Sequence, residues 1–340
     1  MAEPIRVVVL GLSHDHVWGN IPNLQANPQV QIVAGWDVDP ELRARLMERV
    51  PTADVVDDRH RLLHDHYPDV ALVCGSNAES VDLVEEATSH GCHVIVEKPL
   101  ANDLAGGRRM VAAAEEAGVK LIVNWPICWE PALWAAADLA RSGQYGKLWQ
   151  VRWRSSHNGP ESVGCSRQFI DWLYNDAECG HGAFTDYTCY GAAVCAWLLG
   201  TPESVVGYAD RLLKTQSVGA DNAVLLLSYD GAFGQVEASW TQISADPPKR
   251  GLFHCAEALI EPYGNKIRIS TVDQPAGEWV EVPAPPAHLA SLGAYLGALL
   301  AGECEPAGIL DAQVALRAQA IMEAGWEAAV SGQAQDVETS

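Results

Sequence analysis

The first 123 residues alternate between short apolar runs and longer segments with helical spacing, and this alternation constrains the fold most. The apolar runs cover residues 6–10, 30–36, 70–74, 93–96 and 120–123. Segments that can be helical follow them, ending before Pro28 and at 40–50, 80–90 and 104–117. Uninterrupted apolar runs are typical of parallel strands buried on both faces. Strands that alternate with helices predict a Rossmann-type, doubly wound parallel sheet.

The pattern changes after Asn124. Residues 148–154 alternate between Trp or Val and Gln or Arg, which predicts a half-buried strand of an antiparallel sheet. Further strands are expected at 204–213, 222–230, 233–241, 255–261, 266–270 and 278–282, and a helix that packs back at 312–329. We therefore expect two domains, 1–123 and 124–340, the second an α+β domain with an open, mainly antiparallel sheet. One face of that sheet must be covered by helices or by another subunit.

Charge and cysteine usage narrow the class of protein. The 340 residues carry a formal charge of −22, which disfavours nucleic acid as a partner. Nine scattered cysteines without a C-x-x-C pair indicate reduced thiols in a cytosolic protein. The N-terminus runs directly into a strand, without the pattern of a signal peptide, and no apolar run is long enough to cross a bilayer. We expect a cytoplasmic protein with no membrane partner.

The strand at 93–96 delivers Glu97 and Lys98 to its carboxyl end, and Pro99 then stops it. In an open parallel sheet, ligands bind in the crevice beyond the carboxyl ends of the strands. A lysine held there by a rigid strand is placed for chemistry. Most lysines are simply exposed surface residues, so the surrounding pattern has to support this interpretation.

The turn after the first strand predicts a dinucleotide site, although its motif is incomplete. Dinucleotide loops use three glycines, and here only Gly11 is kept, with Ser13 and His16 at the other two positions. The free N–H groups at the start of the next helix still favour an anion. Asp37 ends the second strand, where a carboxylate bonds ribose hydroxyls and repels a 2′-phosphate, so NAD is expected and NADP is disfavoured.

A helix beginning near Phe184 would carry Asp186 and Tyr190, four residues apart, on one face. An acid and a phenol so placed can hold a sugar hydroxyl and move its proton. The simpler interpretation is an acid favoured by the helix dipole and a packed tyrosine. His157, in a loop after a strand, is a candidate substrate contact.

Two His-Asp-His tripeptides, at 14–16 and 64–66, resemble metal ligands. No third cluster with suitable spacing accompanies them, so no metal is expected.

With Glu97-Lys98-Pro99, the approach to Asp186 and the final helices, the chain resembles the glucose–fructose oxidoreductase/inositol dehydrogenase (Gfo/Idh/MocA) family over essentially its whole length. Tyr190 resembles the members with Tyr at the position where others have His. The resemblance implies NAD(P) in the first domain and a sugar or polyol over the second domain's sheet. It also implies that Lys98 is a catalytic lysine, often before a cis proline bond, that Asp186 contacts substrate and that Tyr190 is the acid/base. His181 stands where the family usually has glycine.

The expected cofactor and substrate contacts extend over both domains. The cofactor set is Gly11, Ser13, His14, Asp37, Ser76, Asn77, Glu97, Lys98 and Asn124, and the substrate set is Trp125, His157, His181, Asp186 and Tyr190. Tyr190 would accept the hydroxyl proton while Lys98 favours its phenolate.

The predicted function is an NAD-dependent oxidoreductase that transfers a hydride between nicotinamide and a secondary hydroxyl or keto carbon of a sugar, sugar derivative or polyol. Two alternatives remain: a redox-neutral, NAD-dependent glycosidase that acts by oxidation and elimination, and a non-catalytic nucleotide or sugar sensor. A homodimer or homotetramer through the open sheet is expected.

Overall fold

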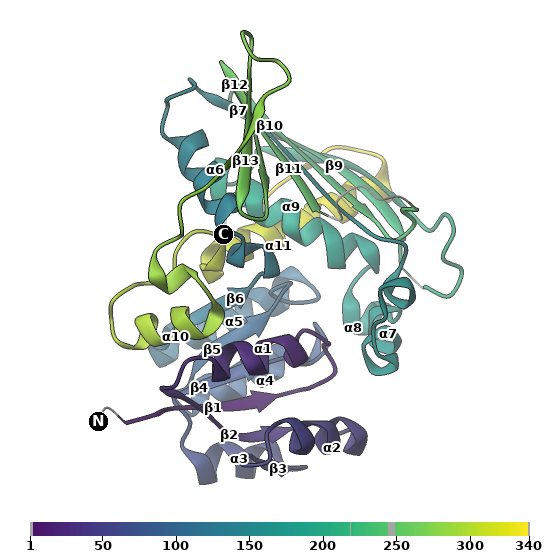
Figure 1. Ribbon diagram of the computed structural model, residues 1–340. Coiled ribbons are helices and arrows are strands. Elements are labelled where there is room, and N and C mark those ends of the chain that lie inside the picture. Colours follow the sequence, from purple (N-terminus) through teal and green to yellow (C-terminus); the bar gives the residue numbers. More distant parts are fainter. Residues whose placement is uncertain (1–2, 218, 244–248, 339–340) are drawn as a thin grey trace.

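The computed structural model describes residues 3–217, 219–243 and 249–338, and its first part is a parallel sheet (Figure 1). The six strands follow the order β3-β2-β1-β4-β5-β6 and pair in parallel throughout. Their bounds are β1 (Ile5–Leu10), β2 (Val30–Trp36), β3 (Asp54–Val56), β4 (Val70–Val73), β5 (His93–Glu97) and β6 (Leu121–Asn124). This confirms the predicted doubly wound sheet.

Five helices connect these strands: α1 (Val17–Gln25), α2 (Pro40–Arg49), α3 (Arg59–His66), α4 (Glu79–Ser89) and α5 (Leu104–Ala117). α2 begins where expected, because the Asp39 carboxylate accepts the Glu41 N–H and Pro40 fills the first position. β3 and α3 were not predicted. β3 has only three residues, and α3 is polar except for Leu62 and Leu63, so neither gives a periodic apolar signal.

The second sheet has nine strands in the order β14-β13-β12-β11-β7-β10-β9-β8-β15. Only the β10–β7 pair is parallel among the described residues, which confirms a mainly antiparallel sheet. The strands are β7 (Leu148–Ser156), β8 (Ser204–Asp210), β9 (Asn222–Tyr229), β10 (Ala232–Ser239), β11 (Lys249–Cys255), β12 (Ala258–Tyr263), β13 (Lys266–Thr271), β14 (Glu278–Glu281) and β15 (Gln335–Asp336). The single strand expected at 255–261 is wrong: β11 ends at Cys255 and β12 starts at Ala258, and the intervening Ala256-Glu257 carries no turn signal.

Helices α9 (Ala183–Leu199) and α11 (Ala312–Ser331) lie between the two sheets (Figure 1). α9 packs on β7, β9 and β10, while α11 contacts β8 and α9 on one side and α5 and β6 on the other. Shorter helices complete the chain: α6 (Pro131–Arg141), α7 (Arg167–Leu173), α8 (Asp176–Cys179) and α10 (Leu292–Leu300). Since α9 is buried along most of its length, its polar side chains are held in fixed positions between the sheets.

Two negative observations concern the described part of the chain. No helix there has both the length and the apolar character needed to span a membrane. All nine cysteines fall within these residues, and none forms a disulfide.

Candidate functional site

A buried ion pair joins the parallel sheet to α9. Lys98 directly follows β5, and its Nζ lies 2.5 Å from Oδ1 of Asp186 in the first turn of α9. The indole N–H of Trp240 donates to the other oxygen, Oδ2, at 3.3 Å. Lys98 is 3% exposed and Asp186 is 6% exposed. The Lys98–Pro99 peptide bond is cis, in agreement with the resemblance.

The two charges hold each other ionised. Burial alone would lower the pKa of Lys98, but the Asp186 carboxylate raises it above its usual value. Burial alone would raise the pKa of Asp186, but Lys98 holds it below its usual value. The crevice therefore contains a charged donor and a charged acceptor side by side, in surroundings that exclude most water, where such groups act strongly on a reacting oxygen.

Tyr190 lies against this pair. Lys98 Nζ is 5.3 Å from the centroid of the Tyr190 ring, and Trp125 and Tyr187 meet the same ring edge-on at 5.7 and 6.0 Å. Burial first, and then the nearby thiol of Cys189 and the Asp186 carboxylate, raise the pKa of Tyr190 well above its usual value. Lys98 therefore does not bring the pKa of Tyr190 below its usual value, because burial of the phenol outweighs any effect of an ammonium that is paired with Asp186.

His157 is fixed in one tautomer beside these aromatic rings. Its Nδ1 accepts the backbone N–H of Gly159 at 2.9 Å, and its ring lies 4.8 Å from that of Tyr187. Burial lowers the pKa of His157. A neutral ring with Nδ1 occupied carries its proton on Nε2, so His157 is a hydrogen-bond donor at that atom.

Glu97 is buried beside Lys98 and held by three side chains. Its Oε1 accepts from the amides of Asn20 (2.5 Å) and Asn124 (2.6 Å), and its Oε2 lies 2.8 Å from His16 Nδ1. Asn124 in turn accepts the Trp129 indole N–H at 2.9 Å. Burial alone would raise the pKa of Glu97, but His16 and the two amides hold it below its usual value. The predicted cofactor residue Asn124 thus orients Glu97.

The loop after β1 is closed against its neighbours. Gly11 has a φ of +77°, and a Cβ there would lie 2.5 Å from the Gly75 nitrogen, so the turn requires glycine. Asp37 accepts the Leu12 N–H at 2.6 Å through Oδ2 and the Asp39 N–H at 2.7 Å through Oδ1. The Asp37 carboxylate therefore ties the loop to the end of β2.

Residues of helix α7 and of its N-cap contact this loop. The Trp172 indole donates to the Ser13 carbonyl at 3.3 Å, and the Ser166 N–H donates to the Asp15 carboxylate at 2.5 Å. Residues from the second half of the chain thus hold the predicted phosphate loop.

Residues of helix α8 form hydrogen bonds with the loop after β4. Ser76 Oγ donates to the Glu178 carboxylate, and the Asn77 amide donates to the Cys179 carbonyl at 2.8 Å. Both residues were predicted to contact the cofactor. Ser76 lines a cavity, whereas the Asn77 side chain is hydrogen-bonded to the backbone of α8.

That cavity, of about 570 Å³, lies between Ser13, Ser76 and Trp172, at the predicted cofactor crevice. Its lining includes six acidic residues and no Lys or Arg: Asp37, Asp39, Glu79, Asp82, Asp171 and Glu178. Burial, together with Asp37 and Glu178, raises the pKa of Glu79 to about 7.

His14 and His16 converge on Glu97. One ring nitrogen from each histidine and one Glu97 oxygen lie within 4.8 Å of one another. The His14 ring is 1% exposed and contacts Phe169 at 4.6 Å, and its Nε2 has no hydrogen-bond partner within the described residues. Burial first, then the charges of His16 and Lys98, hold the pKa of His14 well below its usual value. The sequence near His14 contains no third residue that could bind a metal ion with the two histidines. The fold brings such a residue, Glu97, from the end of β5.

Within the described residues, the ring contacts of His181 are with Phe184 and Trp326, not with Lys98, Asp186 or Tyr190. Its ring stacks on Trp326 of α11, with centroids 3.7 Å apart and planes at 5°, and Phe184 meets it edge-on. These contacts give His181 a packing role on the α11 side of α9.

Sequence reasoning left out several site residues that the fold brings in. Trp240, Asn20 and Tyr187 lie far from Lys98 in sequence and carry no motif. Tyr187 could have been suspected from its place beside Asp186 on the same helix.

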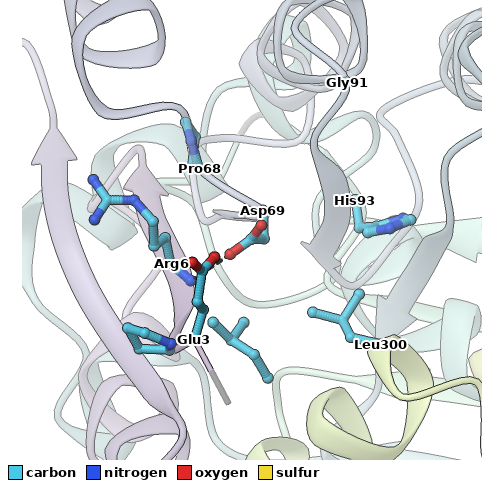
Figure 2. Close-up of a pocket in the computed structure, with 9 residues that line it drawn as sticks. Glu3, Arg6, Pro68, Asp69, Gly91, His93 and Leu300 are labelled. Atoms are coloured by element: carbon cyan, nitrogen blue, oxygen red, sulfur yellow. Dashed lines mark hydrogen bonds between the residues drawn. The ribbon is translucent and has the colours of Figure 1, made fainter. Parts of the chain in front are cut away.

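A larger cavity, of about 650 Å³, opens at the amino ends of the strands (Figure 2). Glu3, Arg6, Asp69 and His93 line it, and the Arg6 N–H donates to Asp69 at 2.7 Å. Ligands of open α/β sheets bind at the opposite, carboxyl ends of the strands. The crevice around Lys98 is therefore the candidate site.

Comparison with protein families gives two adjoining matches. The model described as an oxidoreductase family with an NAD-binding Rossmann fold matches residues 5–125, and the GFO/IDH/MocA C-terminal domain model matches residues 133–261.

Characterised relatives align along most of the chain. A dTDP-3,4-didehydro-2,6-dideoxy-α-D-glucose 3-reductase of Actinomadura kijaniata is 25% identical, over 89% of this chain and 90% of the relative. A myo-inositol 2-dehydrogenase of Thermotoga maritima is 24% identical, over 78% and 74%.

Among solved structures, the WlbA dehydrogenase of Bordetella pertussis in complex with NADH and UDP-GlcNAcA superposes with a TM-score of 0.83 at 20% identity, covering 100% of this chain and 99% of that one. An oxidoreductase of Agrobacterium radiobacter with NAD⁺, L-tartaric acid and magnesium gives a TM-score of 0.82 at 19% identity, covering 98% of each chain. Both likenesses show the same fold.

Proposed function

This chain belongs to the Gfo/Idh/MocA family of oxidoreductases, and from that premise we propose that it transfers a hydride between NAD and a secondary hydroxyl or keto carbon of a sugar, sugar derivative or polyol. The observation that carries the proposal is the buried Lys98–Asp186 pair, placed beside Tyr190 at the carboxyl end of β5. The relatives act, by their names, on a nucleotide sugar and on an inositol.

The residues at the crevice fit a dinucleotide. The turn at Gly11 leaves no room for a Cβ, and the cavity beside Ser13 and Ser76 lies where a nucleotide would approach the sheet. Nicotinamide, when bound, supplies the hydride acceptor or donor. Ser13, Ser76 and Asp37 would hold the nucleotide, and Lys98 would face its reactive end.

The acidic lining of the cavity favours NAD over NADP. Six carboxylates without a Lys or Arg among the lining residues would repel an additional 2′-phosphate. The Asp37 carboxylate is fixed at the end of β2 by two backbone N–H groups. Each of its oxygens keeps a lone pair that could accept a hydrogen bond from a ribose hydroxyl.

The chain's own groups handle the proton. The Lys98 ammonium has three N–H donors, and Asp186 takes one, which leaves donors for a substrate oxygen. Asp186 keeps the ammonium charged and aimed at the crevice. Tyr190, as a neutral phenol, gives a proton to an oxygen that becomes an alcohol and takes it back in the reverse direction. His157 donates from Nε2 to a second substrate oxygen.

Turnover by two variants tests this assignment. We expect Lys98→Met and Tyr190→Phe each to lower kcat at least about 100-fold, the range of general acid–base catalysis, while the Kd of NAD⁺ stays within about threefold. Tyr229→Phe is the matched control, because Tyr229 lies at the end of β9 and its buried hydroxyl has no hydrogen-bond partner among the described residues. Unchanged turnover in both site variants would refute the roles given to Lys98 and Tyr190.

The glycosidase and sensor alternatives gain no support from the relatives, which are named as reductases and dehydrogenases.

A further inference from the structure

The crevice contains a second group of side chains that the proposed hydride transfer does not use. His14 and His16 come from the loop before α1, and Glu97 comes from the end of β5. Three of their potential ligand atoms lie within 4.8 Å of one another. Two imidazoles and one carboxylate are a common ligand set for divalent transition metals, and they leave coordination positions open.

Glu97 is oriented as a metal-bound carboxylate is. Two side-chain amides, from Asn20 and Asn124, fix its Oε1, and this leaves Oε2 directed at His16. Partners that hold a ligating carboxylate from behind are typical of metal sites. The neighbouring cation does not neutralise Glu97, because Lys98 is paired with Asp186.

The two histidines differ in solvent exposure. His14 is packed between Phe169 and Trp172 at 4.6 and 5.7 Å, and its Nε2 is buried without a hydrogen-bond partner within the described residues. A buried polar atom without a partner costs free energy unless a ligand satisfies it. The His16 side chain is 35% exposed, so the cluster is open on one side.

We propose that His14, His16 and Glu97 bind one divalent transition metal ion of the Zn²⁺, Co²⁺ or Ni²⁺ class. Imidazole ligands select this class over Mg²⁺ and Ca²⁺, which prefer oxygen ligands throughout. Three protein ligands would leave coordination positions that oxygen atoms of water or of a small molecule could fill.

The second His-Asp-His tripeptide of the chain provides a matched control. His64 and His66 lie on α3, bonded to Asp65 and Asp54, at 3.1 Å in each case. They have the same spacing and composition as His14 and His16 but contact no Glu comparable to Glu97 in the described residues.

The test is a titration of the full-length, EDTA-treated protein with Co²⁺, followed by its visible absorption band, with Zn²⁺ competing for the same site. We expect one Co²⁺ per chain. His16→Gln should weaken binding about 100-fold or more, Asn124→Ala about tenfold, and His64→Gln/His66→Gln less than twofold.

The chosen variants keep the result decisive even if one of them folds poorly. His16 is partly exposed, so its replacement is the mildest, and wild-type stoichiometry is measured without any variant. A wild type that binds no Co²⁺ or Zn²⁺ at micromolar concentration would overturn the proposal, as would equal losses in His16→Gln and in the His64/His66 control. Because no readout depends on NAD or turnover, the metal site and the hydride transfer can fail separately.

Discussion

Lys98 and Asp186 stay charged inside the protein because each lies 2.5 Å from the other. Removing one partner leaves an uncompensated buried charge, which costs about 3–5 kcal/mol. We therefore expect Lys98→Met to lower the free energy of unfolding by about this amount, and Lys98→Met/Asp186→Leu to recover much of the loss. Urea denaturation of the two variants measures the difference. If the double variant were less stable than Lys98→Met, the pair would not be the source of the effect.

We expect Glu79 to make the proposed binding of NAD⁺ dependent on pH. Its side chain lies against Gly75, in the loop after β4 that packs on Gly11 of the predicted phosphate loop, and its pKa is raised from about 4.5 to about 7. Because the folded state holds the proton more tightly, ionisation of Glu79 disfavours the folded state as pH rises from about 4.5 to 7. The new charge also repels a pyrophosphate, so NAD⁺ should bind more tightly at pH 6 than at pH 8.

Calorimetry at pH 6, 7 and 8 checks this effect. Glu79→Gln should bind NAD⁺ roughly fivefold more tightly at pH 8, equivalent to about 1 kcal/mol, and should lose most of the pH dependence. Glu85→Gln, on the same helix α4, is the control, because its side chain pairs with Arg109 and is not among the residues that line the cavity. A pH dependence that persists unchanged in Glu79→Gln would assign it to another group.

At the residue scale, the sequence could predict the groups that end a strand or share a helix face. Lys98, Asp186 and Tyr190 are of this kind, and they do converge in the structure. Trp240 and Asn20 could not be predicted, because each reaches the site from a distant segment. His16 was noted as a replaced glycine and as part of a His-Asp-His tripeptide, but its partner Glu97 could not be predicted because it is 81 residues away.

Helix α9 carries Asp186 and Tyr190, and its distance from the sheet is set by Gly191. A Cβ at Gly191 would lie 2.5 Å from Val236 Cγ1 on β10 and 3.2 Å from Trp153 Cβ on β7. We expect Gly191→Ala to destabilise the protein by about 1–3 kcal/mol through overpacking. Because the displacement moves the catalytic face of α9, kcat should also fall.

Gly19→Ala is the matched control, since α1 leaves nothing within 4 Å of a Cβ there. That variant should keep its activity and gain up to about 1 kcal/mol from helix propensity. Thermal melts and kcat values of the two variants test whether the position of α9 depends on Gly191. Equal effects of the two substitutions would show that α9 does not depend on close contact at Gly191.

The long helix α11 was predicted within two residues of its bounds, and the start of α9 within one residue. Several errors fall on short or weakly marked elements, although the eleven-residue helix α6 was also not predicted. β3 has three residues, and the turn between β11 and β12 lacks Gly, Pro or Asn. The sequence of β3 resembles irregular chain, and the sequence of the β11–β12 turn resembles a continuous strand. Only pairing with neighbouring strands defines these features.

At the scale of the whole molecule, one face of the second sheet has no helix over β8, β9 and β10 within the described residues. α9 and α11 cover the other face, while Tyr208, Leu226 and Phe233 are 57%, 46% and 38% exposed. Exposed apolar groups on neighbouring strands β8, β9 and β10 are typical of an interface. We propose that two copies of the chain, or two such pairs, associate through this face.

Light scattering on a sizing column measures the number of subunits. Leu226→Asp should shift the wild-type dimer or tetramer towards a smaller species. Met47→Asp is the control, because Met47 is 49% exposed on α2, in the other half of the molecule. A wild type that elutes as a monomer would contradict the proposed interface.

The two halves of the chain meet at the Lys98 crevice, and hydride transfer there is the central claim. Its most direct test is absorbance at 340 nm while the protein is incubated with NAD⁺ and a panel of free sugars, nucleotide sugars, polyols and aryl glycosides. We predict NADH formation in equal amount with an oxidised sugar or polyol, lost in Tyr190→Phe and retained in Tyr229→Phe. Aglycone release without NADH, or no NADH with any member of the panel, would contradict the claim.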